Sequence, residues 1–395
     1  MRTLKLATPL ALAMTLSGCM SLAPKYERPQ APVAASFPEL PKTGGTTLPT
    51  ATSEAPANLS WQRFFADARL RQLIELSLAN NRDLRVAILN IEQARAQYRI
   101  TRADRVPTVS AIVNGSRQST GDDQPTQNIY QAGFGVSNFE LDLFGRVRNL
   151  SESALAQFLA TEEARKTAQI SLIASVANTY LTMLADEELL AITEQTLKTR
   201  VESDRLTRLR FENGVVSKLE LQQSVSLVET ARANYAQFQR QRAQDANLLT
   251  LLVGQPIPDN LAPGTTLAST ELPDLPAGMP SDLLGARPDI RAAEQQLIAA
   301  NANIGAARAN YFPRISLTGS VGSASTELSG LFKSGSFGWT FAPQAILPIF
   351  DLGRIGAGVD AARTGRDVAV AQYEKSIQTA FREVADALAG QATFS

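Results

Sequence analysis

Four stretches of the chain alternate between apolar and polar residues over ten positions or more. Such alternation puts apolar side chains on one face of a β-strand and polar side chains on the other. In the second stretch the alternation changes parity between Val136 and Phe139, which indicates a β-bulge. A half-buried soluble sheet is one interpretation, but strand length, one polar face and aromatic residues near the ends also fit membrane strands. The predicted strands are about 107–117, 129–144, 313–325 and 336–350.

Four strands are too few to close a barrel, because about eight are needed to surround a packed interior. In lipid, an open sheet edge would leave backbone groups without hydrogen bonds, so closure is required there. If the strands are embedded in a membrane, several chains must therefore share one barrel. The strand pattern by itself points to an oligomer.

Long helices are predicted between the strand pairs. Residues 57–106 contain neither Gly nor Pro and are amphipathic, so a helix is expected to end near Arg105 or Val106, just before Pro107. Its counterpart should end near Tyr311 or Phe312. No later stretch is an apolar run of about 20 residues, so no transmembrane helix is expected.

A helical hairpin is the most informative element. The whole run between Gly145 and Gly214 contains neither Gly nor Pro, and a second unbroken run follows from Val215 to Val253. As one helix, the first run would be about 100 Å long, which suits a rod projecting from a membrane better than a globular domain. Gly214 is the natural turn. Spacings of three, four and seven residues predict coiled-coil stripes, at Leu190, Leu197 and Val201, and at Leu221, Val225, Val228 and Tyr235.

The body of the chain is a duplicated unit. Asp83 to Ala87 resembles Asp289 to Ala293 at an offset of 206, and Gly145-Arg146 meets Gly353-Arg354 at an offset of 208. Repeats of this length are domain-sized duplications. The second copy is shorter, because it lacks an equivalent of the helical hairpin. The predicted parts are a signal peptide (1–18), a Pro-rich lipid-anchored tether (19–60), a first repeat (61–254), a linker (255–280) and an incomplete second repeat (281–395).

The N-terminus has the pattern of a targeting segment. Two basic residues precede an apolar run, Leu6 to Leu16, that is too short to span a bilayer. Leu16-Ser17-Gly18-Cys19 follows and looks like a bacterial lipobox, so Cys19 is the predicted lipidation site. An ordinary signal peptide with an incidental cysteine is the alternative. By resemblance to bacterial lipoproteins, Met20 rather than Asp after the cysteine favours the outer membrane.

Composition narrows the possible functions. Lys plus Arg and Asp plus Glu are both 38, so the net charge is zero and a nucleic-acid partner is not expected. The absence of His removes His-based triads and imidazole metal sites, and a single Cys removes disulfides within the chain and Cys-cluster zinc sites. We therefore expect no catalytic residues, no metal ligands and no cofactor, and a transport or structural role rather than an enzyme.

Five segments carry a resemblance to a known family: Trp61 to Phe65, Asn80 to Arg85, Glu140 to Arg146, Arg287 to Ile290 and Gly305 to Arg308. They resemble the TolC outer-membrane factors of the OprM/NodT type, which are efflux lipoproteins. The resemblance implies an α+β membrane protein, a homotrimer that shares one β-barrel of twelve strands, four per chain, above a long periplasmic α-helical barrel. It implies a passive exit duct for drugs or other small toxic compounds across the outer membrane of a Gram-negative bacterium, with a periplasmic adaptor and an inner-membrane pump of the resistance-nodulation-division type as partners.

The resemblance also assigns roles at the hairpin turn. In relatives this tip meets the adaptor and forms part of the periplasmic gate, which implies adaptor-contact roles for Arg210, Gly214, Val215, Ser217 and Leu219. Capping of a helix pair is the structural alternative for each residue. Acidic residues near the tip often ring the pore, and the local candidates are Asp204 and Glu212. A solvated helix face is the alternative for both.

One departure from the family pattern leaves other functions open. At offset 208 Ser395 meets Glu187, so the second tip and its gate residues have no equivalent in the chain. A chain truncated at its C-terminus relative to the family, deficient in assembly, is therefore one alternative. A structural coiled-coil lipoprotein that acts as an adaptor is another, although such a protein needs no lipid-facing β-bands.

Overall fold

The computed structural model describes residues 21–37, 60–119, 126–269 and 281–394. The chain divides into two compact units, each assembled from separate segments. The first unit comprises residues 1–35, 90–163 and 284–387, and the second comprises residues 36–89, 164–283 and 388–395.

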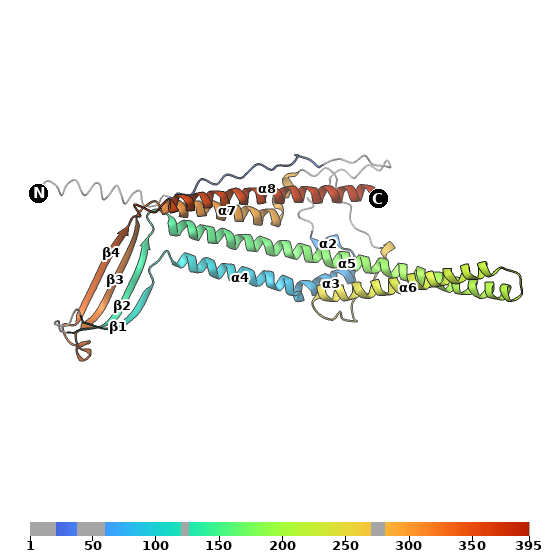
Figure 1. Cartoon of the computed structure of the whole chain (residues 1–395), viewed down its shortest axis with the longest axis horizontal. Helices are drawn as coiled ribbons and strands as arrows, with labels where there is room; N and C mark the ends of the chain where they lie inside the picture. The colour runs from blue at the N-terminus through green and yellow to red at the C-terminus, as the bar shows by residue number, and fades with distance from the viewer. Residues whose placement is uncertain (1–20, 38–59, 120–125, 270–280, 395) are drawn as a thin grey trace. The chain divides into compact units, whose positions relative to one another are not determined.

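Four strands of the first unit form one antiparallel sheet in the order β1-β2-β3-β4 (Figure 1). The four strands predicted from the alternation are confirmed, with ends that differ by no more than four residues. Their bounds are Val109–Gln118 (β1), Gln127–Leu141 (β2), Arg314–Ser325 (β3) and Phe337–Ile346 (β4).

The predicted bulge in β2 is confirmed. The β2–β3 ladder shifts register between Val136 and Phe139, where β2 contains one residue more than β3. Within the bulge Asn138 has φ of 53°, and its N–H donates a 3.1 Å hydrogen bond to Oγ1 of Thr318. Because of this extra residue, odd-numbered residues after the bulge lie on the sheet face that even-numbered residues occupy before it.

Four helices contribute to the first unit. They are α4 (Arg82–Ala103), the start of α5 (Arg146–Glu212), α7 (Pro288–Ala309) and α8 (Arg354–Phe394). The described part of the chain also has three short 3₁₀ turns, Leu267–Ser269, Ser281–Ala286 and Leu328–Gly330. Helices α4 and α7 end two to three residues before the predicted positions. The last residues still turn through i→i−3 hydrogen bonds, such as Val106 N–H to Ala103 at 3.1 Å, so the helix tightens before the proline.

The second unit corrects the prediction of one helix across residues 57–106. Instead α2 (Trp61–Phe64) and α3 (Ala68–Asn80) precede α4. Asp67 caps α3 by accepting hydrogen bonds from the N–H groups of Arg69 and Leu70 at 2.7 and 3.0 Å. Asn81 caps α4 in the same way, with Leu84 N–H at 2.9 Å. A helix can be interrupted without Gly or Pro, because an Asp or Asn side chain accepts hydrogen bonds from the N–H groups at the start of the next helix.

An apolar core holds the second unit together. It joins α3, the start of α4, the middle of α5 and the end of α6 (Lys218–Val253). Its largest fully buried side chain is Tyr180. The core residues are Phe65, Leu70, Leu73, Ile74, Leu84, Leu172, Val176, Ala177, Tyr180, Met183, Leu184, Leu249 and Val253.

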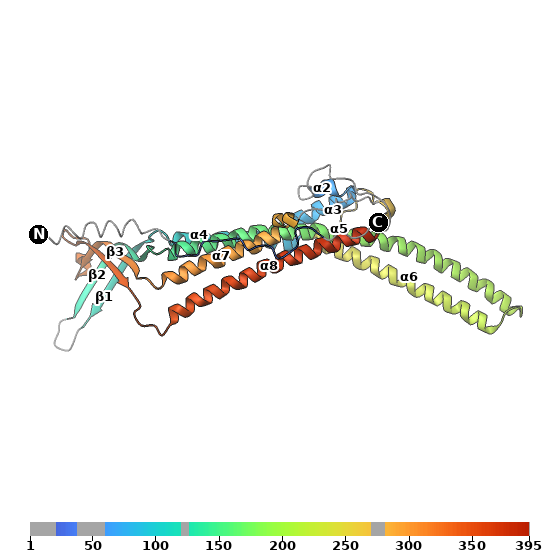
Figure 2. The same ribbon diagram turned by 90° about the horizontal axis from the view of Figure 1, so that it is seen from above.

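The long α5 and α6 form the predicted hairpin, and they run side by side in both views (Figures 1 and 2). The predicted stripe is wrong at Val201, which is 47% exposed, while Asp204 is buried at 8%. The inward face therefore includes polar residues that a search for apolar spacing misses. One window of α5 is long and apolar enough to cross a membrane by length and composition, although no such helix was expected. Of that window, 44% is buried within the chain.

Candidate functional site

One face of the sheet is apolar and open. Residues in one row across the four strands are Ala111, Phe134, Val321 and Trp339. The large members are solvent-exposed, from 46% at Val321 to 72% at Trp339. An exposed apolar band that continues across every strand is typical of a lipid-facing surface.

The opposite face is polar. Ser110, Gly135, Ser320 and Thr340 form one row on it. The hydroxyl groups of Ser320 and Thr340 share a hydrogen bond of 2.8 Å across β3 and β4. Small and hydroxyl side chains on this face suit contact with water, as the inner wall of a membrane barrel requires.

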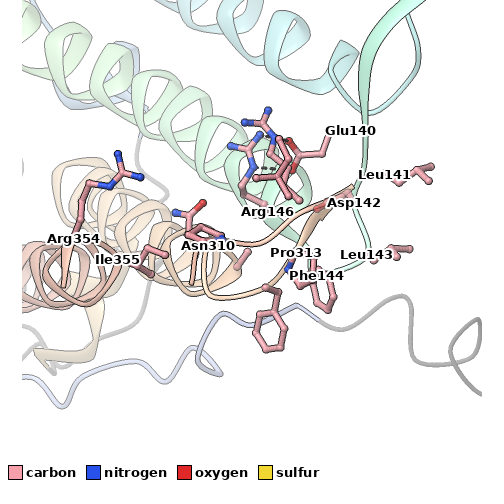
Figure 3. Close-up of a pocket in the computed structure, with 16 residues that line it drawn as sticks. Glu140, Leu141, Asp142, Leu143, Phe144, Arg146, Asn310, Pro313, Arg354 and Ile355 are labelled. Atoms are coloured by element: carbon pink, nitrogen blue, oxygen red, sulfur yellow. Dashed lines mark hydrogen bonds and ion pairs between the residues drawn. The ribbon is translucent and has the colours of Figure 1, made fainter. Parts of the chain in front are cut away.

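A charged cluster ties the sheet to the helices of the first unit (Figure 3). Both carboxylate oxygens of Glu140, near the end of β2, accept hydrogen bonds of 2.7 Å from Arg146 at the start of α5. Arg314, the first residue of β3, pairs with the same carboxylate at 2.5 Å. The Glu140 side chain is only 10% exposed, so the pairing fixes the strand-to-helix connection.

A cavity of about 480 Å³ lies beside this cluster. It is bounded by the β2–α5 connection, the α7–β3 connection and the start of α8, and Phe144 and Phe312 stack in its wall with centroids 4.6 Å apart. Its carboxylates are engaged, Glu140 by two arginines and Asp142 by the N–H of Arg148 at 2.7 Å. Among the described residues no group of three possible metal ligands occurs.

The hairpin turn is closed by backbone geometry. Gly214 has φ of +69°, and the N–H of Val215 donates a 2.8 Å hydrogen bond to the carbonyl of Arg210. This left-handed residue ends α5, as glycine commonly does. Ser217 then opens α6 by accepting a hydrogen bond from Glu220 N–H at 3.3 Å. The Ser-x-x-Glu spacing is a capping box.

The structure brings the predicted tip residues together on one exposed loop. Val215 is 63% exposed and Leu219 is 67% exposed, and Arg210, Gly214 and Ser217 are exposed as well. In the isolated chain these two apolar side chains are open to solvent.

The two gate candidates differ in their surroundings. Glu212 is exposed at the tip, as a solvated helix face would be. The solvated-face alternative is wrong for Asp204, whose Oδ2 accepts a 2.6 Å hydrogen bond from Arg208. Its Oδ1 is buried without a hydrogen-bond partner among the described residues.

The predicted lipidation site, Cys19, lies outside the described residues. The chain that follows it is extended, without helix, and is docked on the first unit. Ser21 donates a 2.7 Å hydrogen bond to Asn149, and Arg28 makes a bidentate ion pair with Glu294 at 2.7 and 2.8 Å. Gly305 lies directly under this segment, since a Cβ there would approach Ala23 N to 2.6 Å. The Pro-rich composition predicted a tether but gave no signal for this dock.

Comparison with known proteins agrees with this arrangement. The profile of the family described as outer membrane efflux protein matches residues 73–255 and 279–395. Among curated relatives, the antibiotic efflux pump outer membrane protein ArpC of Pseudomonas putida is 51% identical, over 98% of this chain and 81% of that protein. The solvent efflux pump outer membrane protein SrpC of Pseudomonas putida is 48% identical, over 98% and 83%.

A solved structure shares the whole fold. The open state of the MtrE outer membrane channel of Neisseria gonorrhoeae superposes with a TM-score of 0.83 at 42% identity, over 94% of this chain and 82% of that one. The predicted fold class and the predicted role as an outer-membrane efflux component are confirmed by these relationships. The apolar sheet face, the polar sheet face and the long hairpin thus have one common explanation: this chain belongs to the outer membrane efflux protein family.

Proposed function

We propose that three copies of this chain share one β-barrel in the outer membrane and form the passive exit duct of a tripartite efflux system. The observation that carries the proposal is the four-stranded sheet. It has an exposed apolar band on one face, and the outer edges of β1 and β4 are not paired with another described strand. Open edges are not tolerated in lipid. Three copies supply twelve strands, enough to surround a lumen rather than a packed core.

The hairpin tip is the proposed contact with the rest of the efflux system. Val215 and Leu219 are exposed apolar side chains beside the exposed Arg210. A periplasmic adaptor would cover the apolar pair and bring the duct to an inner-membrane pump of the resistance-nodulation-division type. The pump supplies the energy, so the duct itself needs no catalytic residues, and we assign it no enzymatic activity.

The proposed cargo is small toxic compounds, including antibiotics and organic solvents. Support comes from the relatives named for antibiotic and for solvent efflux, which are about half identical to this chain. The polar row that includes Ser320 and Thr340 supports a water-filled lumen with a polar wall. Such molecules would pass along this wall without being bound.

Cys19 is the proposed lipid anchor. The docked segment from Ser21 onward would hold the acyl chains beside the first unit. A palmitate label retained by a Cys19→Ala variant would exclude the assignment.

The oligomeric state in the outer membrane tests the whole proposal. Intact cells are treated with a short crosslinker, outer membranes are isolated, and the product is sized on a denaturing gel. A trimer band is expected. The chain should also restore drug or solvent tolerance to a host whose own outer-membrane efflux channel has been deleted. Monomer alone in the outer membrane would contradict the proposal and favour an assembly-deficient chain. Recovery in a soluble periplasmic fraction would favour an adaptor lipoprotein.

A further inference from the structure

Two carboxyl groups meet at the base of the helical hairpin. Asp186 on α5 and Asp245 on α6 are in hydrogen-bonding contact with each other. The apolar core cluster lies directly beside them, with Leu184 as its last member on α5 and Leu249 as its first member on α6. From Asp186 to the turn at Gly214 the helix extends about 42 Å at 1.5 Å per residue. The acid pair therefore joins the two helices where the hairpin leaves the core.

Both acids are withdrawn from water. Asp186 is 8% exposed, and Oδ2 of Asp245 is buried without a hydrogen-bond partner among the described residues. One turn earlier on α6, Oε1 of Gln241 is buried and equally without a partner in the described part of the chain. An ionised carboxylate accepts hydrogen bonds and cannot donate one. Two carboxyl groups in contact at a buried place therefore need a proton between them.

Neighbouring charges do not neutralise the acid pair. On α5 the next residues are Glu187 and Glu188, which are acidic as well. On α6 the nearest cation is Arg242, and its guanidinium is engaged by Glu187 at 3.0 and 2.8 Å. Glu188 accepts a 3.2 Å hydrogen bond from the backbone of the segment after α6. The last residues of α8 in the same unit, 388–394, contain no charged side chain.

The other charged groups on the adjoining elements are also no counter-ions for the acid pair. They are Arg69, Arg71 and Glu75 on α3, which packs against α6, and Asp259 in the segment after α6. Among the described residues no basic side chain forms an ion pair with either acid. A proton is thus the remaining means of relieving the repulsion between the two acids.

We infer that Asp186 and Asp245 form a proton-binding site that acts as a clasp between α5 and α6. With one proton bound, the O–H of one carboxyl donates a charge-assisted hydrogen bond to the other carboxylate and ties the helices together. When this proton passes to water, two buried like charges face each other and push the helices apart. The clasp lies within one chain, so it does not depend on the shared barrel.

The sign of the pH dependence follows from the surroundings of Asp245. Burial, together with the hydrogen bond and the charge of Asp186, raises the pKa of Asp245 above its ordinary value. The unfolded chain loses this proton at the ordinary pKa, so the folded chain keeps it over a higher range of pH. The cost of ionising the site is therefore absent in acid and grows as pH rises through the raised pKa. Acid should tighten the base of the hairpin, and alkali should loosen it.

A change at the base is magnified at the turn. Because the helices continue for about 42 Å, a tilt of about 5° between them would move the turn by roughly 4 Å. If the turn contacts an adaptor, the bound proton would set the position of that contact. This consequence alone rests on the function proposed above.

Hydrogen exchange of the full chain in outer-membrane vesicles tests the clasp. Asp245→Asn and Asp186→Asn each remove the proton equilibrium and keep an N–H donor for the remaining carboxylate. The unchanged chain and the variants are compared at the same pH, so that the intrinsic effect of pH on exchange cancels. At alkaline pH the unchanged chain should exchange several-fold faster than either variant in the peptides that contain Asp186 and Asp245. The difference should disappear in acid.

Asp204→Asn is the matched control, because Asp204 is a buried acid of the same hairpin that pairs with Arg208 at 2.6 Å. It should not reproduce the pH-dependent difference. Equal exchange of the unchanged chain and both amide variants at every pH would overturn the clasp. Calcium or magnesium that restores protection to the unchanged chain in alkali, and not to the variants, would overturn the shared proton and assign a bound cation instead.

Infrared spectroscopy tests the proton without any variant. With isotope-labelled Asp carboxyl groups, the unchanged chain at about pH 6 should show the band of a protonated Asp, since an ordinary Asp is almost wholly ionised there. Absence of this band would overturn the site even if the amide variants fail to assemble. The oligomeric state is measured in the same samples. A monomeric chain that shows the band would contradict the shared barrel and leave the clasp intact.

Discussion

The phenol of Tyr180 donates a 3.0 Å hydrogen bond to Oδ2 of Asp67 in the centre of an apolar core. Thr265 donates to the same oxygen at 2.5 Å, and the other oxygen caps α3. One carboxylate therefore connects α5, the start of α3 and the segment after α6. It is the polar centre of the second unit.

Replacing Asp67 by Ala should lower the free energy of unfolding by about 2–4 kcal/mol, because a helix cap is lost and the hydroxyl groups of the buried Tyr180 and of Thr265 lose their acceptor. Thermal unfolding in detergent, followed by circular dichroism, measures the change. Glu75, on the same helix and outside the described core cluster, offers a control, since Glu75→Ala should have little effect. Equal losses for both variants would contradict the role of Asp67.

The same group predicts a pH dependence. Burial alone would raise the pKa of Asp67, but the hydrogen bonds from Thr265, Leu70, Tyr180 and Arg69 outweigh it and hold the pKa below its ordinary value. Its stabilisation is therefore present at neutral pH and lost as pH falls through the lowered pKa. Burial and the Asp67 charge raise the pKa of Tyr180 to about 12, so its contribution is lost as pH rises from 10.0 through that value. Unfolding of Asp67→Asn should be less sensitive to acid than that of the unchanged chain.

At the hairpin tip, Gly214→Ala should weaken the turn by about 1 kcal/mol, because a Cβ is disfavoured at φ of +69°. No atom lies within 4 Å of the added Cβ, so the cost is conformational and not steric. Gly214→Asn should be tolerated, since Asn adopts this conformation more readily, whereas Gly214→Pro should disorder the tip. Crosslinking of the tip to a periplasmic adaptor should fall in the order Asn, Ala, Pro. If the proline variant crosslinked to the adaptor as well as the unchanged chain does, the tip would be excluded as the contact with the adaptor.

Gly305→Val should release the docked N-terminal segment. The new side chain would collide with Asn149 and with the backbone of Ala23. Limited proteolysis should cut within residues 21–37 faster than in the unchanged chain, while the helices stay resistant. Gly358→Val on α8 is the matched control, because nothing lies within 4 Å of a Cβ there. Similar cleavage of both variants would mean that Gly305 does not control the dock.

Glu140→Gln should loosen the connection between β2 and α5. Two arginines, Arg146 and Arg314, would lose a nearly buried carboxylate, and the expected loss is about 2–4 kcal/mol. The temperature at which the oligomer dissociates should fall accordingly. Glu152→Gln on the exposed face of α5 is the control, since its pair with Arg148 is open to solvent and worth little. An unchanged dissociation temperature in Glu140→Gln would contradict this role.

The two acidic gate candidates should behave differently in planar bilayers. Glu212→Gln, at an exposed position, should reduce the preference for cations if it borders the pore. Asp204→Asn should leave the current ratio unchanged and alter the hairpin instead, because Asp204 is buried against Arg208. A change of selectivity in the Asp204 variant alone would reverse this assignment.

Periodicity was sufficient to predict the strands and the bulge between Val136 and Phe139, and a long run without Gly or Pro was sufficient to predict the 67-residue α5. It was insufficient at Asp67 and Asn81, where a polar side chain ends a helix without Gly or Pro. Periodicity also predicted Val201 to lie inside the hairpin. A search for apolar spacing misses a buried polar residue, and the buried residue here is Asp204. Contacts between distant segments, such as Ser21 with Asn149, have no local signature.

The bulge has a consequence for symmetry. Six copies of the same strand pair, two from each of three chains, could in principle form a ring with six equivalent positions. In the described ladders only β2 has a bulge, and β2 leads into the 67-residue α5 whereas β4 leads into the 41-residue α8. The two halves are therefore not equivalent, so such a ring is threefold and neither half of the chain can take the place of the other. A gene duplication that began with interchangeable parts has thus become a chain with a fixed order around the pore.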